Sequence, residues 1–143
     1  MTTSEAYAFL NSVRNIEREI LKLQLRRDEL ESCLLPGAIR YDGDRVQTTP
    51  EDKMSEIAAQ VWDMDRDMVD LRLRKAKLIV EVNNAIAQLE NDTEQVVLLG
   101  FYVGRLPAAK VAEITHYSIP GVYKVKRRAV KHLAEKCTQS IGV

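Results

Sequence analysis

The segment that decides the fold is residues 93–136, which read TEQVVLLGFYVGRLPAAKVAEITHYSIPGVYKVKRRAVKHLAEK. Its apolar residues fall into three groups that are separated by turn signals. The first group runs from Val96 to Val103, follows a capping sequence that starts at Asn91, and ends at Gly104. A polar cap, an acidic first turn and a glycine after the last apolar residue are the usual limits of a helix. We therefore predict a first, strongly apolar helix here.

Two shorter groups follow and predict a second and a third helix. Pro107 suits the start of the second helix, because its missing N–H is not needed there. Its predicted buried face is Val111, Ala112 and Ile114. A tight turn follows at residues 115–117, and Ser118 is placed to cap the third helix, whose predicted buried stripe is Val122, Val125, Ala129 and Leu133. Helix, short turn, helix is the spacing of a helix-turn-helix.

Basic charge collects in this C-terminal third. Lys+Arg and Asp+Glu both total 21, but residues 92–143 hold 8 basic and 4 acidic groups, a balance of +4, against −1 for residues 1–35 and −3 for residues 36–91. A basic helix that carries a tyrosine and follows a tight turn is typical of contact with phosphates and the DNA major groove. The alternative is an amphipathic helix whose Lys and Arg are simply solvated. The residues that we predict to contact DNA are Ser118, Ile119, Tyr123, Lys124, Lys126, Arg127, Arg128 and Lys131.

The first ninety residues contain two heptad seams. Apolar residues from Phe9 to Leu34, and again from Met54 to Leu89, alternate steps of three and four, which predicts two long helices with Ser4 capping the first and Thr49-Pro50 starting the second. Arg27 and Lys75 occupy seam positions, where polar residues fix either register or oligomeric state. The seams predict an all-α fold in which residues 1–90 form an antiparallel coiled-coil hairpin for oligomerisation and residues 91–143 form the helix-turn-helix domain.

Three features of the N-terminal region have two interpretations each. The connection at residues 35–50 is rich in turn formers and is either a plain loop or a partner contact through Arg40, Tyr41 and Arg45. Trp62 beside the second seam is expected to pack against the first helix, or else to serve a protein interface. The acidic run from Asp63 to Asp70 is expected to be a solvated face rather than a metal site.

Catalytic and metal-binding motifs are not found in the sequence. His116 and His132 stand apart, His116 being expected in a turn, and no nucleophile motif or Gly-rich phosphate loop is present. The two cysteines, Cys33 and Cys137, form no CxxC pattern. We expect neither an enzyme nor a cofactor. The N-terminal sequence lacks a secretion signal and no apolar run reaches membrane-spanning length, so we expect a cytoplasmic protein without a membrane partner.

Residues 89–133 resemble region 4 of sigma factors and the related late-activator regulators of Gram-positive phages and prophages, of the RinA/ArpU kind. The shared features are an apolar first helix, Ala112-Glu113-Ile114 in the second helix, Tyr117-Ser118 in the turn and the run from Val122 to Leu133. The resemblance implies promoter DNA as partner and contact with host RNA polymerase. In one departure, Ile119-Pro120-Gly121 replace the long polar side chains with which region 4 reads bases, so phosphate contacts are expected to dominate.

Three functions are therefore open. The first is a phage-type transcription regulator that binds double-stranded DNA as an oligomer, at least a dimer. The second is a terminase small subunit for DNA packaging, because such proteins also join a helix-turn-helix to a coiled-coil hairpin. The third is a structural coiled-coil protein whose basic C-terminal helix binds an acidic protein.

Overall fold

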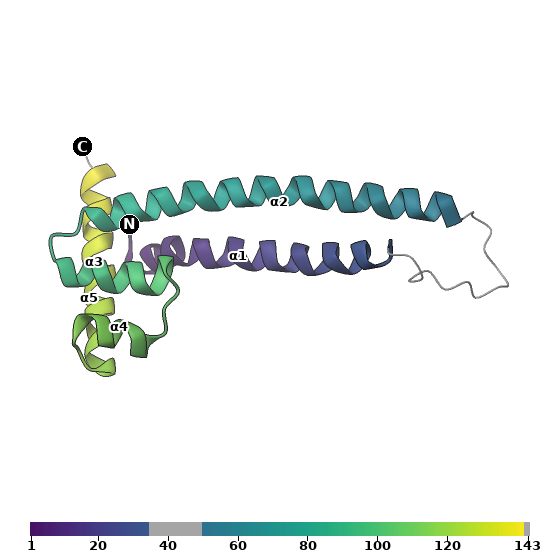
Figure 1. Cartoon of the computed structure of the whole chain (residues 1–143). Helices are drawn as coiled ribbons and strands as arrows, with labels where there is room; N and C mark the ends of the chain where they lie inside the picture. The colour runs from purple at the N-terminus through teal and green to yellow at the C-terminus, as the bar shows by residue number, and fades with distance from the viewer. Residues whose placement is uncertain (35–49, 142–143) are drawn as a thin grey trace. The chain divides into compact units, whose positions relative to one another are not determined.

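The computed structural model describes residues 1–34 and 50–141 of the chain, and within them every regular element is helical. In chain order these are α1 (Thr3–Ser32), α2 (Pro50–Ala87), α3 (Asp92–Leu98), the π-helix η1 (Leu99–Val103), α4 (Ala108–Thr115) and α5 (Ile119–Ile141) (Figure 1). The all-α prediction is confirmed. The predicted contacts Arg40, Tyr41 and Arg45 and the Thr49 cap lie outside the described residues.

The helices form two compact units, one made of Ile16–Arg74 and the other of Met1–Asn15 with Lys75–Val143. In the first unit, α1 and α2 run in opposite directions (Figure 1). The seam positions Ile16, Val61 and Met68 are buried there, as a helix with an apolar stripe requires. Trp62, by contrast, is 68% exposed, so the expectation that it packs against the first helix is wrong. Trp62 follows the buried seam position Val61, and successive residues of an α-helix are rotated by about 100° around its axis. The Trp62 side chain therefore points away from the seam.

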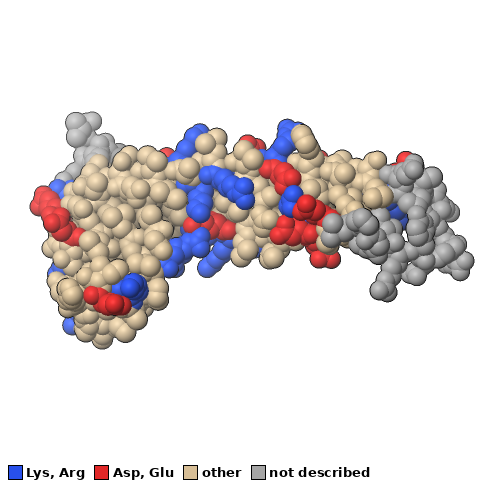
Figure 2. Space-filling view, in the orientation of Figure 1, with Lys and Arg blue, Asp and Glu red and all other residues tan. Residues whose placement is uncertain are grey.

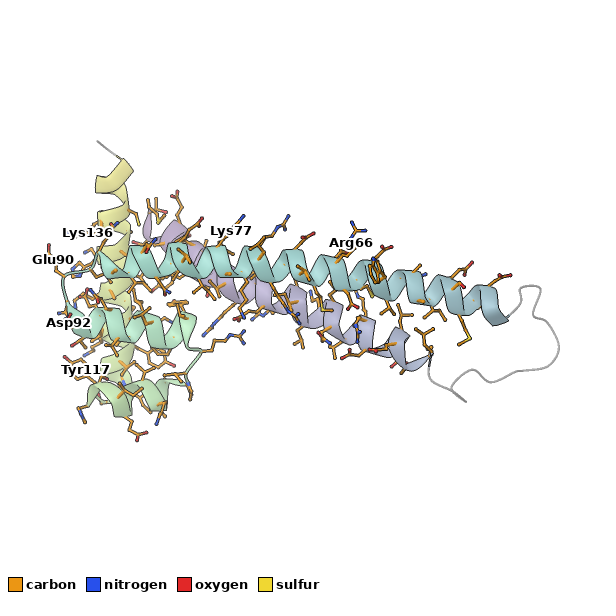
Figure 3. The ribbon with its side chains drawn as sticks, turned by 45° about the horizontal axis from the view of Figure 1, so that its top comes forward. Arg66, Lys77, Glu90, Asp92, Tyr117 and Lys136 are labelled. Atoms are coloured by element: carbon orange, nitrogen blue, oxygen red, sulfur yellow. The ribbon has the colours of Figure 1, made fainter. Side chains whose placement is uncertain are left out.

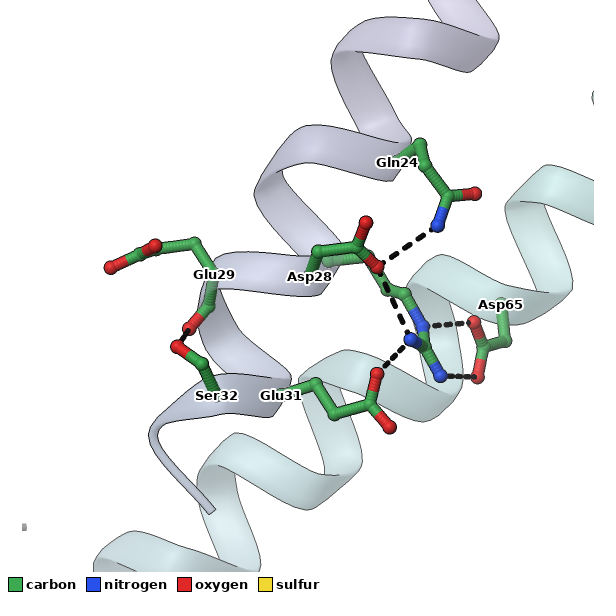
Figure 4. Close-up of polar contacts among 7 residues, drawn as sticks. Gln24, Asp28, Glu29, Glu31, Ser32 and Asp65 are labelled. Carbon is green, nitrogen blue, oxygen red and sulfur yellow. Dashed lines mark hydrogen bonds and ion pairs between the residues drawn. The ribbon is translucent and has the colours of Figure 1, made fainter. Parts of the chain in front are cut away.

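A polar cluster joins the two helices of this unit at the seam position Arg27 (Figure 4). The Arg27 guanidinium donates from Nε to Asp65 on α2 at 2.8 Å, and it also contacts Asp28 and Glu31 on its own helix. The hydrogen bond to Asp65 is the main cause that raises the pKa of Arg27. The pairing of Arg27 with Asp65 favours one axial alignment of the two helices, which agrees with the register role among the two predicted for Arg27.

The second unit has one continuous apolar core. Both long helices and the four elements that follow them contribute to it: Ala6, Leu10, Val13, Val82, Ile86, Leu89, Val97, Leu98, Phe101, Tyr102, Val111, Ala112, Val122, Val125, Ala129, Val130, Leu133 and Ala134. The first turns of α1 and the last turns of α2 therefore share a core with the C-terminal helices. A domain boundary near residue 90 stays a prediction.

Four predictions about where helices begin and what they bury can be checked in this unit, which includes the start of α1. Asn91 caps α3, as predicted, by accepting from the Glu94 N–H at 3.1 Å. Ile114 is 47% exposed, so its predicted burial is wrong; α4 buries only Val111 and Ala112. Pro107 is the N-cap of α4 rather than its first helical residue. The cap of α1 is Thr2 rather than Ser4, because the Thr2 hydroxyl, three residues before Glu5, accepts from the Glu5 N–H.

Candidate nucleic-acid interface

The C-terminal part of the chain brings α4 and α5 together across a short turn. α4 ends where His116 adopts the left-handed conformation (φ 60°) and its N–H, like that of Tyr117, reaches the Ala112 carbonyl. The Thr115 hydroxyl donates to the Val111 carbonyl at 2.8 Å and closes the last turn. Such a left-handed residue ends a helix sharply and satisfies carbonyls that would otherwise lack partners. The predicted turn is therefore present, with exposed His116 as its capping residue.

Ser118 begins α5 by capping it. Its hydroxyl accepts from the Gly121 N–H at 3.1 Å, and its carbonyl accepts from the Val122 N–H at 2.9 Å. A Cβ at Gly121 would lie 3.1 Å from the Ser118 hydroxyl oxygen, so a side chain at 121 would crowd the cap. Pro120 is tolerated because N–H groups in the first turn have no helical partner. Ile119-Pro120-Gly121, which depart from the sigma pattern, thus make a tightly capped helix start.

The outer face of α5 is basic. Val122, Val125, Ala129 and Leu133 are buried, as predicted, while Lys124, Arg127, Arg128 and Lys131 are exposed. These four residues are spaced i, i+3, i+4 and i+7, so they lie on one side of the helix and form what we call the basic stripe. The face that α3 and α4 present in Figure 2 carries few charged side chains. The positive charge predicted for this helix is thus concentrated on a single side.

Tyr123 and Lys126, also predicted to contact DNA, form an aromatic cluster beside the basic stripe. Tyr123 is 42% exposed and stacks on Phe101, with ring centroids 5.9 Å apart. Lys126 places its Nζ 4.8 Å from the centre of the Phe101 ring and 5.3 Å from that of Tyr102. Burial, and secondarily the charge of Arg14, lower the pKa of Lys126. Lys126 is therefore engaged within the protein, and Tyr123 is the member of the cluster that a ligand can reach.

Arg128 is held by an acidic residue that the sequence did not single out. Glu94 on α3 is only 2% exposed, and its Oε1 accepts from Arg128 Nε at 2.9 Å. His132 Nδ1 lies 3.0 Å from both carboxylate oxygens. These groups line a groove of about 350 Å³ that also includes Lys136. Lys136 forms an ion pair with Glu90 at 3.0 Å, and both residues are labelled in Figure 3. The spacing of Arg128 and His132, four residues apart, is the signal that could have pointed to a shared carboxylate.

Arg14 is a second side chain near this surface whose contacts the sequence did not indicate. Its guanidinium donates to the Phe101 carbonyl at 3.0 Å and lies over the Tyr102 ring at 5.7 Å. Phe101 and Tyr102 belong to the π-helix η1, near the C-terminal end of the α3–η1 segment, where carbonyls lack helical partners and a cation is favourable. Gly100 permits close packing there, because a Cβ would lie 3.1 Å from a Val111 methyl group.

The described residues were also considered as a metal site and as a membrane-spanning segment, and the chain was compared with known proteins. Within residues 1–34 and 50–141 no cluster of His, Cys, Asp or Glu could hold a metal ion. The same part of the chain has no helix that combines the length and apolar character needed to span a bilayer. Comparison of the chain with protein-family models, with curated proteins and with solved structures found no match.

Proposed function

We propose that this protein binds double-stranded DNA through α4, the turn His116–Ser118 and α5, acting as a helix-turn-helix, and that α1 and α2 form a coiled-coil hairpin that serves oligomerisation. The proposal includes a regulatory role in transcription like that of the sigma region 4 relatives, and no catalytic activity. The observation that carries it is the basic stripe: four cations on one side of the helix that follows the turn.

The cations of the basic stripe differ in how firmly the protein holds them, which supports two different roles in binding. Lys124, Arg127 and Lys131 have side chains that are free to meet phosphates, while Arg128 is oriented by Glu94. A cation fixed by a buried carboxylate loses less conformational entropy on binding than a freely rotating one. Tyr123 and Ile119, both nearly half exposed, are the side chains available for a base edge or a thymine methyl group.

A fluorescence-anisotropy titration of a labelled duplex at several salt concentrations tests this proposal. Four contacts per protomer predict a slope of log K against log salt of roughly −4, because each neutralised phosphate releases counterions. Lys131→Ala should flatten the slope by about one unit for every duplex sequence. The matched control is Lys53→Ala, which removes the same charge from the exposed surface of α2 and should leave the slope unchanged.

Two outcomes would count against DNA binding through the basic stripe. A slope near zero with a folded protein would favour the third function, a helix that binds an acidic protein. An equal effect of Lys53→Ala and Lys131→Ala would mean that binding responds to total charge rather than to the basic stripe. Ring-sized assemblies in light scattering, with DNA binding retained, would favour the packaging role instead of regulation.

A further inference from the structure

The turn between α4 and α5 carries a concentration of exposed apolar side chains. Ile114, Tyr117, Ile119 and Tyr123 lie close together in the sequence, and each is between 42% and 47% exposed. Single exposed apolar residues are ordinary on a protein surface, whereas larger exposed groups mark interaction sites. Ile119 and Tyr123, four residues apart on α5, are neighbours on one side of that helix, and Arg127 continues the same row. The apolar pair Ile119 and Tyr123 therefore stands next to the basic stripe.

The first turn of α5 offers few hydrogen-bonding side chains to a base. Ser118 uses its hydroxyl oxygen to accept the Gly121 N–H at 3.1 Å, and Pro120 and Gly121 have no polar side-chain atoms. Recognition of a base edge by two hydrogen bonds needs side chains such as Arg, Asn or Gln, and residues 118–121 include none of these. The exposed side chain of this turn is the branched aliphatic group of Ile119, and Tyr123 follows it one turn later.

Only one of the four DNA bases offers an apolar group in the major groove. Thymine carries its C5-methyl group there, while the other three bases are read through hydrogen-bond donors and acceptors. Tyr123 is suited to pack on such a group, because its ring already stacks on Phe101 with centroids 5.9 Å apart and so loses little freedom on binding. Ile119 is branched at Cβ, which likewise limits its rotamers. An apolar pair beside a row of cations thus matches a polyanion that carries methyl groups.

We infer that Ile119 and Tyr123 pack against thymine methyl groups in the major groove, so that the DNA preferred by this protein has thymine opposite the first two turns of α5. The inference rests on the proposed function and specifies the class of DNA sequence that the same surface selects. Lys124, Arg127 and Lys131 hold the helix against the phosphates, and the apolar pair adds a preference among bases. Burial of one methyl group corresponds to about a fourfold gain in affinity.

Replacing thymine by uracil tests this inference, because uracil keeps the pairing and the hydrogen-bonding groups of thymine and lacks only the methyl group. Fluorescence anisotropy with the full chain at one fixed salt concentration compares an A·T-only duplex with the same duplex made with uracil. We expect the thymine duplex to bind at least about fourfold more tightly.

Variants of the chain locate the contact. Ile119→Ala and Tyr123→Ala should each weaken binding to the thymine duplex more than binding to the uracil duplex, so that the ratio of the two dissociation constants falls toward one. The matched control is Val80→Ala, which shortens a 57% exposed aliphatic side chain on α2 and should leave the ratio unchanged. Lys131→Ala should weaken both duplexes by the same factor, because a phosphate contact does not depend on the base.

The outcomes separate this inference from the proposed function. Equal affinities for the thymine and uracil duplexes, with a salt slope of roughly −4 retained, overturn the methyl contact and leave DNA binding standing. A ratio that neither Ile119→Ala nor Tyr123→Ala lowers, in proteins that circular dichroism shows to be folded, traces the preference to another part of the chain and overturns the inference as well. Absence of binding to either duplex overturns the proposed function and this inference with it.

Discussion

Glu94 and Arg128 form a hydrogen-bonded ion pair of 2.9 Å in which the carboxylate is almost fully buried and the guanidinium side chain is half exposed. The pair links α3 to α5 within one unit, and His132 adds a second contact to the same carboxylate. A buried carboxylate requires such partners, because water cannot compensate its charge. One residue of the basic stripe therefore contributes to the fold as well as to the proposed interface.

The first prediction separates these two roles. Arg128→Ala leaves the Glu94 carboxylate buried with His132 alone, and we expect the free energy of unfolding to fall by about 2 kcal/mol. Arg127→Ala removes an exposed cation of the same stripe and should change it by less than about 0.5 kcal/mol. Urea denaturation followed by circular dichroism measures both. Equal stabilities would show that the Glu94–Arg128 pair contributes nothing net to folding.

The second prediction concerns alkaline pH. Burial raises the pKa of Tyr102 to about 12, so the folded chain keeps its phenol proton where the unfolded chain loses it. The folded state then binds more protons between pH 10 and about 12, and its stability should fall as pH rises through that window, by roughly 2 kcal/mol from this group.

Tyr102→Phe removes the group and should flatten the decline in stability between pH 10 and 12, as measured by urea denaturation at several pH values. Lys126→Met is an informative control, since the lowered pKa of Lys126 acts with the opposite sign. In that variant the loss between pH 10 and 12 should persist, whereas the rise in stability that Lys126 contributes as pH approaches 10.5 should disappear. A Tyr102→Phe protein as pH-sensitive as the unsubstituted chain would contradict the assignment.

The third prediction concerns the start of α5. Ser118→Ala removes the acceptor of the Gly121 N–H and should cost about 1 kcal/mol of stability, whereas Ser118→Asp keeps a capping oxygen and should cost much less. If α5 binds DNA, the aspartate should nevertheless weaken binding, because it adds a negative charge at the end of the helix nearest the turn. Thermal denaturation and anisotropy on the same samples compare the two effects.

The fourth prediction concerns the register of the long helices. Asp65→Arg sets two guanidinium groups against each other at the Arg27 position and should lower the midpoint of thermal denaturation. The exchange Arg27→Asp with Asp65→Arg should restore part of the loss, because the pair is re-formed with its ends reversed. No recovery in the double variant would mean that Asp28 and Glu31, which also contact Arg27, dominate its environment.

The sequence by itself determined the helices, their approximate limits and much of what they bury. Heptad and helical spacing show which side of a helix is apolar, and they predicted the seams through Val61 and Val82 and the buried stripe of α5. The type of the residue before each helix predicted the caps at Asn91 and Ser118. Such signals are local: each depends on residues within a few positions of one another.

Only the tertiary structure decided what depends on residues distant in sequence. Glu94 reads as an ordinary acidic first-turn residue until α5 brings Arg128 and His132 to it, and nothing near Arg14 points to the carbonyl of Phe101. Trp62 and Ile114 are large apolar residues of the kind found in cores, but they lie just outside the buried face of their helices. Packing selects which part of an apolar stripe is covered, and that choice is made by the neighbouring helix rather than by the spacing of the stripe.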